Sequence, residues 1–351
     1  MIAYQGYISK LIIIVINDIT VCYHPAFSLS IGIIRILPEM RRDGRCARIT
    51  TDMLNLDSEK HLYMFAGKGG VGKTTCAAIT ALHLASLGKR TLIISTDPSP
   101  SVRDIFEITS RENRVKVADN LFLEEIREDD VKARWKKKFG PEVYEVISAY
   151  IPVEKDFIDY FADAPGISDE FMLDYIRDLV LNRDFDHIVW DTAPSGHTLR
   201  LLKMPGIFIS HMNAAVNVYS RLKKGRESGR SIFTILSSWT KMSQDLVEFL
   251  RSNTQYTLVA IPEALSVVQV EGILKDLKGE GLAVNQIIIN NVLQSCEGEF
   301  LKARHDMQQR YIKQLTDTYG KTVGITELCL LPGEARGIAS LSKLDKALFG
   351  D

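Results

Sequence analysis

The chain has 351 residues, of which 46% are hydrophobic and 25% are charged, and its formal net charge is -1. These values are ordinary for one large globular domain, or for one domain that carries a sizeable insertion. A net charge near zero disfavours a general nucleic-acid binder, and no apolar run approaches the roughly 20 residues that span a membrane. The five cysteines lack paired spacing, which favours reduced thiols and a cytoplasmic location.

Residues 1–58 are predicted to be an N-terminal extension. They alternate apolar bursts with a basic run at 41–45, and the first clear strand starts only near Leu62. We interpret residues 1–52 as a mis-assigned upstream start or a disordered segment, with Met53 as a natural start. An extra β-rich edge is the alternative interpretation of this segment.

The most informative stretch, GKGGVGKTT, fits the phosphate-cradle pattern G-x-x-x-x-G-K-[ST]. Glycines in this pattern let the backbone curl tightly and turn its N–H groups toward an anion. An apolar strand is predicted before the loop at 62–66, and a helix after it at 75–87, whose N-terminus adds partial positive charge. The residues predicted to bind nucleotide phosphates are Gly67, Lys68, Gly69, Gly70, Val71, Gly72, Lys73, Thr74 and Thr75.

Short apolar runs alternate with helical segments after this loop. The predicted strands are 91–95, 121–126, 187–190, 257–261, 286–289 and 326–331. Runs of this length favour an α/β fold with a doubly wound, mostly parallel sheet and helices on both faces. Because ligands bind beyond the carboxyl ends of such strands, Asp97, Asp191 and Asn290 are predicted to lie at the same edge as the phosphate loop.

Phosphoryl transfer from ATP depends on positioning and charge stabilisation, so these strand-end residues are candidates for its chemistry. Lys73 is predicted to contact the terminal phosphates, and the Thr74 hydroxyl to coordinate Mg²⁺. Asp191 is predicted to hold Mg²⁺ through water, and Asp97 to orient the attacking water. The alternative for Asp97 is a turn or helix-cap residue before residues 102–106.

Two stretches, 129–184 and 205–252, interrupt the alternation and are predicted to be helical. They would form a helical subdomain inserted in a P-loop ATPase domain that covers residues 59–351. The second stretch carries apolar residues at helical spacing, including Ile232, Ile235 and Trp239. These side chains either pack on the core or line an apolar groove for a partner, and the sequence leaves both readings open.

The phosphate loop, the Asp97-Pro98 pair and above all residues 191–202 (DTAPSGHTLRLL) resemble the ArsA/Get family of deviant P-loop ATPases. Further matching strings lie at 261–266, 289–291, 302–304 and 333–337, so the resemblance covers roughly residues 60–345. One branch of this family drives arsenite efflux. The other carries tail-anchored membrane proteins to the membrane, as a dimer that closes on ATP.

The resemblance implies roles for individual residues. Asp97 matches the water-activating aspartate of the first switch loop, and Asp191 matches the second switch. Lys68 matches a lysine that crosses the dimer interface to the partner's nucleotide, which makes it the second candidate catalytic residue beside Asp97. Glu263 and Asn290 match nucleotide contacts, with Asn290 at the adenine.

Departures from the family pattern carry their own expectations. The targeting branch bridges its dimer with zinc through a C-x-x-C pair, and the matching positions here are Gly298 and Leu301, with only Cys296 nearby. Since structural zinc takes four ligands, we expect no zinc site. The arsenite branch uses three cysteines as soft ligands, and no cysteine lies between Cys76 and Cys296.

The resemblance therefore implies a cytoplasmic, Mg²⁺-dependent ATPase that forms a nucleotide-dependent homodimer. Its expected client is the apolar helix of a tail-anchored protein, a membrane receptor is a further partner, and no nucleic acid is expected. The alternative function is the ATPase subunit of an arsenical pump. A MinD/ParA-type positioning switch shares the lysine-rich loop but lacks the string at 196–200, and a nitrogenase-reductase-like carrier would need cluster-ligating cysteines that are not in place.

Overall fold

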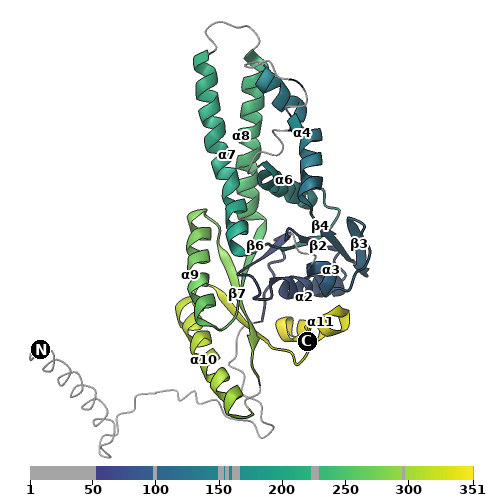
Figure 1. The fold of residues 1–351 in the computed structure, drawn as a ribbon, viewed down its shortest axis with the longest axis vertical. Coiled ribbons are helices and arrows are strands. Elements are labelled where there is room, and N and C mark those ends of the chain that lie inside the picture. The colour runs from purple at the N-terminus through teal and green to yellow at the C-terminus, as the bar shows by residue number, and fades with distance from the viewer. Residues whose placement is uncertain are drawn as a thin grey trace, which may run out of the picture. The chain divides into compact units, whose positions relative to one another are not determined.

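The computed structural model describes residues 53–97, 101–148, 154, 158–159, 167–222, 229–294 and 297–350 (Figure 1). The interpretations of residues 1–52 as a mis-assigned start, a disordered segment or an edge strand therefore lie outside the described residues. Among the described helices, none is both long enough and apolar enough to cross a membrane.

A sheet of eight strands forms the centre of the described fold, in the order β3-β4-β2-β5-β1-β6-β7-β8. The strands are β1 (Leu62–Ala66), β2 (Thr91–Ser95), β3 (Arg114–Ala118), β4 (Leu121–Glu125), β5 (His187–Asp191), β6 (Thr254–Ala260), β7 (Val284–Val292) and β8 (Gly324–Cys329). Neighbouring strands run parallel except β3 and β4, which are antiparallel. The predicted α/β fold with a doubly wound, mostly parallel sheet is confirmed.

Alternation along the strands divides the core into two layers. Leu62 and Met64 of β1 face one layer, whereas Tyr63 and Phe65 face the other, because successive strand side chains point to opposite faces. The second layer holds α2 (Lys73–Ser86), α3 (Ser101–Ile105) and α11 (Gly337–Phe349). The first layer holds α4 (Glu128–Ser148), α6 (Ile167–Leu181), α7 (Ser195–Leu222), α8 (Gly229–Ser252), α9 (Ala264–Gly279) and α10 (Glu299–Tyr319).

Both stretches predicted to be helical contain helices: α4 and α6 in the first, α7 and α8 in the second. Figure 1 shows α7 and α8 side by side as a hairpin, and they are in contact along their length. The start of the second stretch was wrong, because α7 begins at Ser195 and continues through Pro205. The matching string at 191–202 therefore includes the start of α7. We define the helical layer as α4, α6, α7 and α8.

The apolar residues of α8 that were candidates for a groove are mostly buried. Ile232, Ile235 and Leu236 lie inside the protein, and the pair Ile232 and Leu236 packs against Met212 and Val216 of α7. These side chains hold the hairpin together. For this part of α8, the structure supports packing on the core rather than an open groove.

One strand was missed in the sequence. β3 pairs with β4 through a tight turn at Asp119 and Asn120, where Asn120 adopts a positive φ of 59°. Asparagine tolerates this left-handed conformation better than most residues. The signal was present in the alternation of Val115 and Val117 with polar residues.

The folded domain also begins before the predicted boundary at residue 59. Leu54 is buried, and its N–H donates to the Leu348 carbonyl over 3.0 Å. The Asp57 N–H donates to the buried Gln255 side chain over 2.8 Å. Residues 54–57 are thus bonded to α11 and to β6.

Candidate active site

The phosphate loop connects the carboxyl end of β1 to α2. Gly70 and Gly72 adopt positive φ values of 79° and 96°, a conformation that favours glycine. A Cβ on Gly72 would lie only 2.1 Å from the Asn290 side-chain nitrogen. Because α2 starts at Lys73, slightly earlier than predicted, Lys73 and Thr74 belong to its first turn. This turn presents free backbone N–H groups and the positive end of the helix dipole, which suits an anion.

A hydrogen bond joins this first turn to the end of β5. Thr74 Oγ1 donates to Asp191 Oδ2 over 2.8 Å. Asp191 is fully buried, and its Oδ1 has no hydrogen-bond partner among the described residues. A hydroxyl beside a carboxylate with a spare oxygen forms a hard oxygen-ligand set, which fits Mg²⁺.

Burial sets the charge state of this carboxyl. It raises the pKa of Asp191 to about 7, and the negative charge of Asp97 acts in the same direction. The hydrogen bond from Thr74 and the charge of Lys73 lower the same pKa. The protein thus holds a carboxyl at the loop that changes charge near neutral pH.

Lys73, the first residue of α2, is buried beside the phosphate loop. Its Nζ donates to the Lys68 carbonyl over 3.1 Å. Burial lowers the Lys73 pKa, whereas the charges of Asp191 and Asp97 raise it. Asp97 is half-buried, and its N–H donates to Ser95 Oγ over 3.2 Å. The structure therefore brings Lys73, Thr74, Asp97 and Asp191 together at one sheet edge.

Hydrogen bonds that were not predicted from the sequence join the residues after Asp191 to β1 and to the phosphate loop. The Ser195 N–H donates to the Gly67 carbonyl over 3.1 Å, and Thr192 Oγ1 donates to the Phe65 carbonyl over 2.7 Å. Thr198 Oγ1 closes the turn onto the Ala193 carbonyl over 2.8 Å. Nothing in the spacing of these hydroxyls revealed the bonds, because each partner is a backbone carbonyl.

Of the two remaining candidates, Asn290 lies within β7 rather than beyond its end, Glu263 lies beyond the end of β6, and each contacts another protein group. Asn290 is buried, and its Nδ2 donates to the Val71 carbonyl over 2.9 Å. It therefore supports the back of the phosphate loop, and the expected contact with adenine stays a prediction. Glu263 directly precedes α9 and forms an ion pair with Arg304 of α10.

Metal-binding side chains are sparse in the part of the chain that the structure describes. There, no three His, Cys, Asp or Glu side chains gather in a way that could hold a metal ion on their own. Cys76 is buried in α2, and Cys329 is partly buried at the end of β8. Cys296 lies outside the described residues, so the expectation of no zinc stays a prediction.

Comparison with known proteins places this geometry in context. The model of the anion-transporting ATPase family matches residues 60–350. The chain is 32% identical to the ATPase GET3A of Arabidopsis thaliana, over 82% of this chain and 83% of that protein. It is 30% identical to the ATPase ASNA1 homolog of Dictyostelium discoideum, over 84% and 91% respectively. It is also 31% identical, over 74% and 89%, to a protein of Aquifex aeolicus provisionally named arsenical pump-driving ATPase 2.

Proposed function

Because this chain belongs to the anion-transporting ATPase family, we propose that its ATP hydrolysis drives the delivery of tail-anchored membrane proteins to a membrane. The ATPase activity follows from the family and from the named relatives. The client, the dimer and the cytoplasmic location are parts of the proposal. The observation that carries the client assignment is the continuity of α7, which runs from the nucleotide edge into a helical layer with exposed apolar side chains.

The proposed binding step uses the loop and the first turn of α2. Backbone N–H groups around Gly70 and Gly72 would cradle the phosphates, and Lys73 would exchange its bond to the Lys68 carbonyl for the terminal phosphates. Thr74 and, through water, Asp191 would hold Mg²⁺, which neutralises phosphate charge when bound. Thr74 and Asp191 are already hydrogen-bonded, so little rearrangement is needed.

Hydrolysis also requires an oriented water. Asp97 follows β2 at this edge and lies close enough to Lys73 and Asp191 to shift the pKa of both. Its carboxylate would accept a hydrogen bond from the attacking water and fix its direction. We propose that Lys68 adds positive charge in trans, to the nucleotide of a second copy of the chain.

An apolar surface beside the site supports the homodimer. Phe300 of α10 is 80% exposed, and it lies one helical turn before Arg304, which pairs with Glu263. Leu265 and Val268, at the start of α9, are also exposed. These exposed apolar side chains lie on α9 and α10, which contact each other, and a second copy would cover them.

The proposed client surface lies on the α7–α8 hairpin. Ile207 of α7 is 43% exposed and Phe233 of α8 is 49% exposed, whereas the core side chains between the two helices are buried. An apolar transmembrane helix would pack against such side chains because burial removes apolar surface from water. Since α7 starts at Ser195, shortly after Asp191, a change at the nucleotide can move this surface.

The client assignment can be tested by co-expression with a single-span, C-terminally anchored protein. Ile207→Asp and Phe233→Asp should each reduce the recovered complex, because a charge opposes burial of the client helix. Leu181→Asp is the matched control, since Leu181 is 60% exposed at the end of α6. Absence of any complex, or equal loss with the control, would refute client binding on this hairpin.

The ATPase subunit of an arsenical pump, which drives arsenite efflux, is the second candidate, favoured by the name of the Aquifex aeolicus relative. Soft thiolate ligands would be needed, and no cysteine lies between Cys76 and Cys296 in the sequence. Cys76 is fully buried, and burial raises its thiol pKa to about 12, which disfavours the thiolate. Stimulation of ATP hydrolysis by arsenite would favour this alternative over the client proposal.

A further inference from the structure

A buried arginine holds the short helix α3 in place, together with the core side chains Val102 and Ile105. α3 begins at Ser101, shortly after Asp97 in the chain, and residues 98–100 between them lie outside the described residues. Arg103 of α3 is only 7% exposed, and its Nε pairs with Glu125 Oε2 over 2.7 Å. Its two terminal nitrogens donate to the carbonyls of Ser110 and Glu112. Arg103 therefore fixes α3, the first described element after Asp97, to the end of β4.

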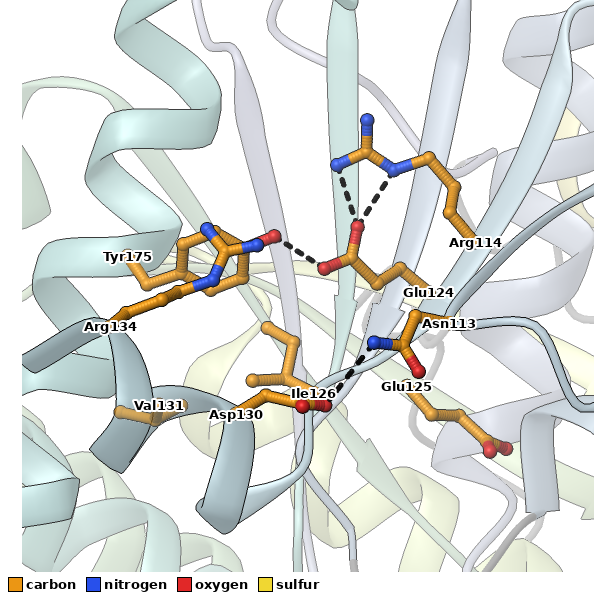
Figure 2. Close-up of a pocket in the computed structure, with 9 residues that line it drawn as sticks. All are labelled: Asn113, Arg114, Glu124, Glu125, Ile126, Asp130, Val131, Arg134 and Tyr175. Carbon is orange, nitrogen blue, oxygen red and sulfur yellow. Dashed lines mark hydrogen bonds and ion pairs between the residues drawn. The ribbon is translucent and has the colours of Figure 1, made fainter. Parts of the chain in front are cut away.

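Glu124, the residue before Glu125 in β4, points to the opposite face of the sheet. Figure 2 shows Glu124 between Arg114 of β3 and Tyr175 of α6. Arg114 donates to Glu124 Oε2 from Nε over 2.8 Å, and the Tyr175 hydroxyl donates to Glu124 Oε1. Because consecutive strand residues point to opposite faces, Glu124 faces the helical layer and Glu125 faces α3.

Tyr175 connects this strand end to more of the helical layer. The Arg134 guanidinium of α4 lies 3.9 Å from the centre of the Tyr175 ring, as Figure 2 shows. Arg177, further along α6, donates to the Met242 carbonyl of α8 over 3.3 Å. A displacement of α6 relative to β4 would therefore reach both α4 and α8.

Two observations indicate that these contacts have room to rearrange. The Glu125 Oε1 atom is buried and accepts no hydrogen bond from the described residues, so one acceptor of the Arg103 contact is unused. A cavity of about 340 Å³ opens beside Glu124 and Tyr175, with Arg134 and Asp130 in its wall (Figure 2). An unused buried acceptor and open space next to a charged cluster suit a contact that shifts between two arrangements.

We propose that Glu124 and Glu125, the last two residues of β4, form a joint that couples α3, and through the chain Asp97, to the helical layer, with Arg103 and Tyr175 as positioning residues on its two faces. This joint is separate from the connection through α7, which follows β5. The inference rests on the proposed function, in which Asp97 acts on ATP and the helical layer on the client.

The test is a double-mutant cycle on ATP hydrolysis with Arg103→Gln, Tyr175→Phe and the double variant. Each single change should lower kcat and leave the KM for ATP within about twofold, because neither residue touches the phosphate loop. The effect of the double variant should depart from the product of the single effects by about threefold or more. Arg103→Lys should recover part of the loss, since the ion pair with Glu125 is kept.

Tyr63→Phe provides the matched control. Tyr63 is a buried phenol on β1 whose hydroxyl donates to the Asp57 carbonyl over 3.0 Å, away from β4. Combined with Arg103→Gln, it should give a simple product of effects. If thermal unfolding shows that Arg103→Gln is not folded, Arg103→Lys takes its place in both double-mutant cycles. A simple product for the Arg103 and Tyr175 pair would overturn the joint.

Hydrogen exchange gives a readout that does not need activity. Tyr175→Phe should speed amide exchange in the peptide 97–105, and Tyr63→Phe should not, because only Tyr175 reaches this loop through β4. Unchanged exchange in 97–105 would contradict the joint. If the wild-type chain shows no ATP hydrolysis, the proposed function fails, and this measurement still decides the joint by itself.

Discussion

Thr74 and Asp191 lie 117 positions apart in the chain, and the Thr74 hydroxyl donates to Asp191 Oδ2 over 2.8 Å. The bond links the first turn of α2 to the last residue of β5, and this helix and this strand meet at the phosphate loop. It places a hydroxyl and a buried carboxylate side by side before any ligand is considered. The two side chains that are predicted to hold Mg²⁺ are therefore already adjacent. The predicted chemistry of the candidate site can be tested one residue at a time.

Lys68→Ala and Lys73→Ala should separate two roles within one loop. Lys73→Ala should weaken ATP binding and hydrolysis together, because Lys73 is the buried cation at the loop. Lys68→Ala should keep binding but lower kcat by about 10³-fold, the scale of a charge supplied in trans. Titration with a fluorescent ATP analogue and steady-state hydrolysis measure the two effects. Hydrolysis by Lys68→Ala at the wild-type rate would contradict the proposed action of Lys68 in trans on the nucleotide of a second copy.

Asp97→Asn should lower kcat by about 10²-fold or more while ATP still binds, because the amide orients water but accepts its proton poorly. The half-buried position of Asp97 allows this isosteric change without a packing defect. Single-turnover hydrolysis, with binding measured in parallel, checks it. Asp104→Asn in α3 is the control, and an equal loss there would indicate a general disturbance of the loop instead.

The raised pKa of Asp191 predicts how stability depends on pH in the absence of nucleotide and Mg²⁺. Its pKa is about 7 in the folded protein and 3.8 in a model peptide, so between these values the folded state holds a proton that the unfolded state has lost. This contribution is complete below about pH 4 and is lost as the pH rises through 7. The free energy of unfolding should therefore fall between pH 5 and 7, by on the order of 1.4 kcal/mol per pH unit at most.

Urea unfolding at several pH values measures this dependence. Asp191→Asn should flatten it, whereas Asp317→Asn, at an exposed pair with Lys313, should not. Added Mg²⁺ should also flatten it in the wild-type chain, because a bound cation favours the ionised carboxylate. The same slope in wild type and Asp191→Asn would exclude Asp191 as its source.

Gly72→Ala should lower the melting temperature of the nucleotide-free protein and prevent ATP binding. A Cβ at this position would meet the Asn290 side chain at 2.1 Å, and φ of 96° is strained for alanine. Gly69→Ala is the matched change, since a Cβ there meets nothing within 4 Å. Equal melting temperatures for the two variants would show that the loop relaxes around residue 72.

The sequence by itself determined the elements whose signal is local. The phosphate loop was readable because its glycines, one lysine and one threonine form a local pattern that is typical of anion binding. Most strands were readable because a buried parallel strand needs a short, continuous apolar run. The carboxyl ends of those strands then placed Asp97 and Asp191 at one edge, and in the structure Ser95 at the end of β2 pairs with Asp191 at the end of β5.

Only the tertiary structure decided the features that depend on distant partners. It showed that Ile232 and Leu236 are core residues, because the period of an amphipathic helix does not reveal what covers its apolar face. It placed Asn290 against the Val71 carbonyl, and it paired Arg103 with Glu125. A charged side chain in a sequence looks the same whether it is solvated or buried, since burial and pairing are set by chain segments that meet only in the folded state.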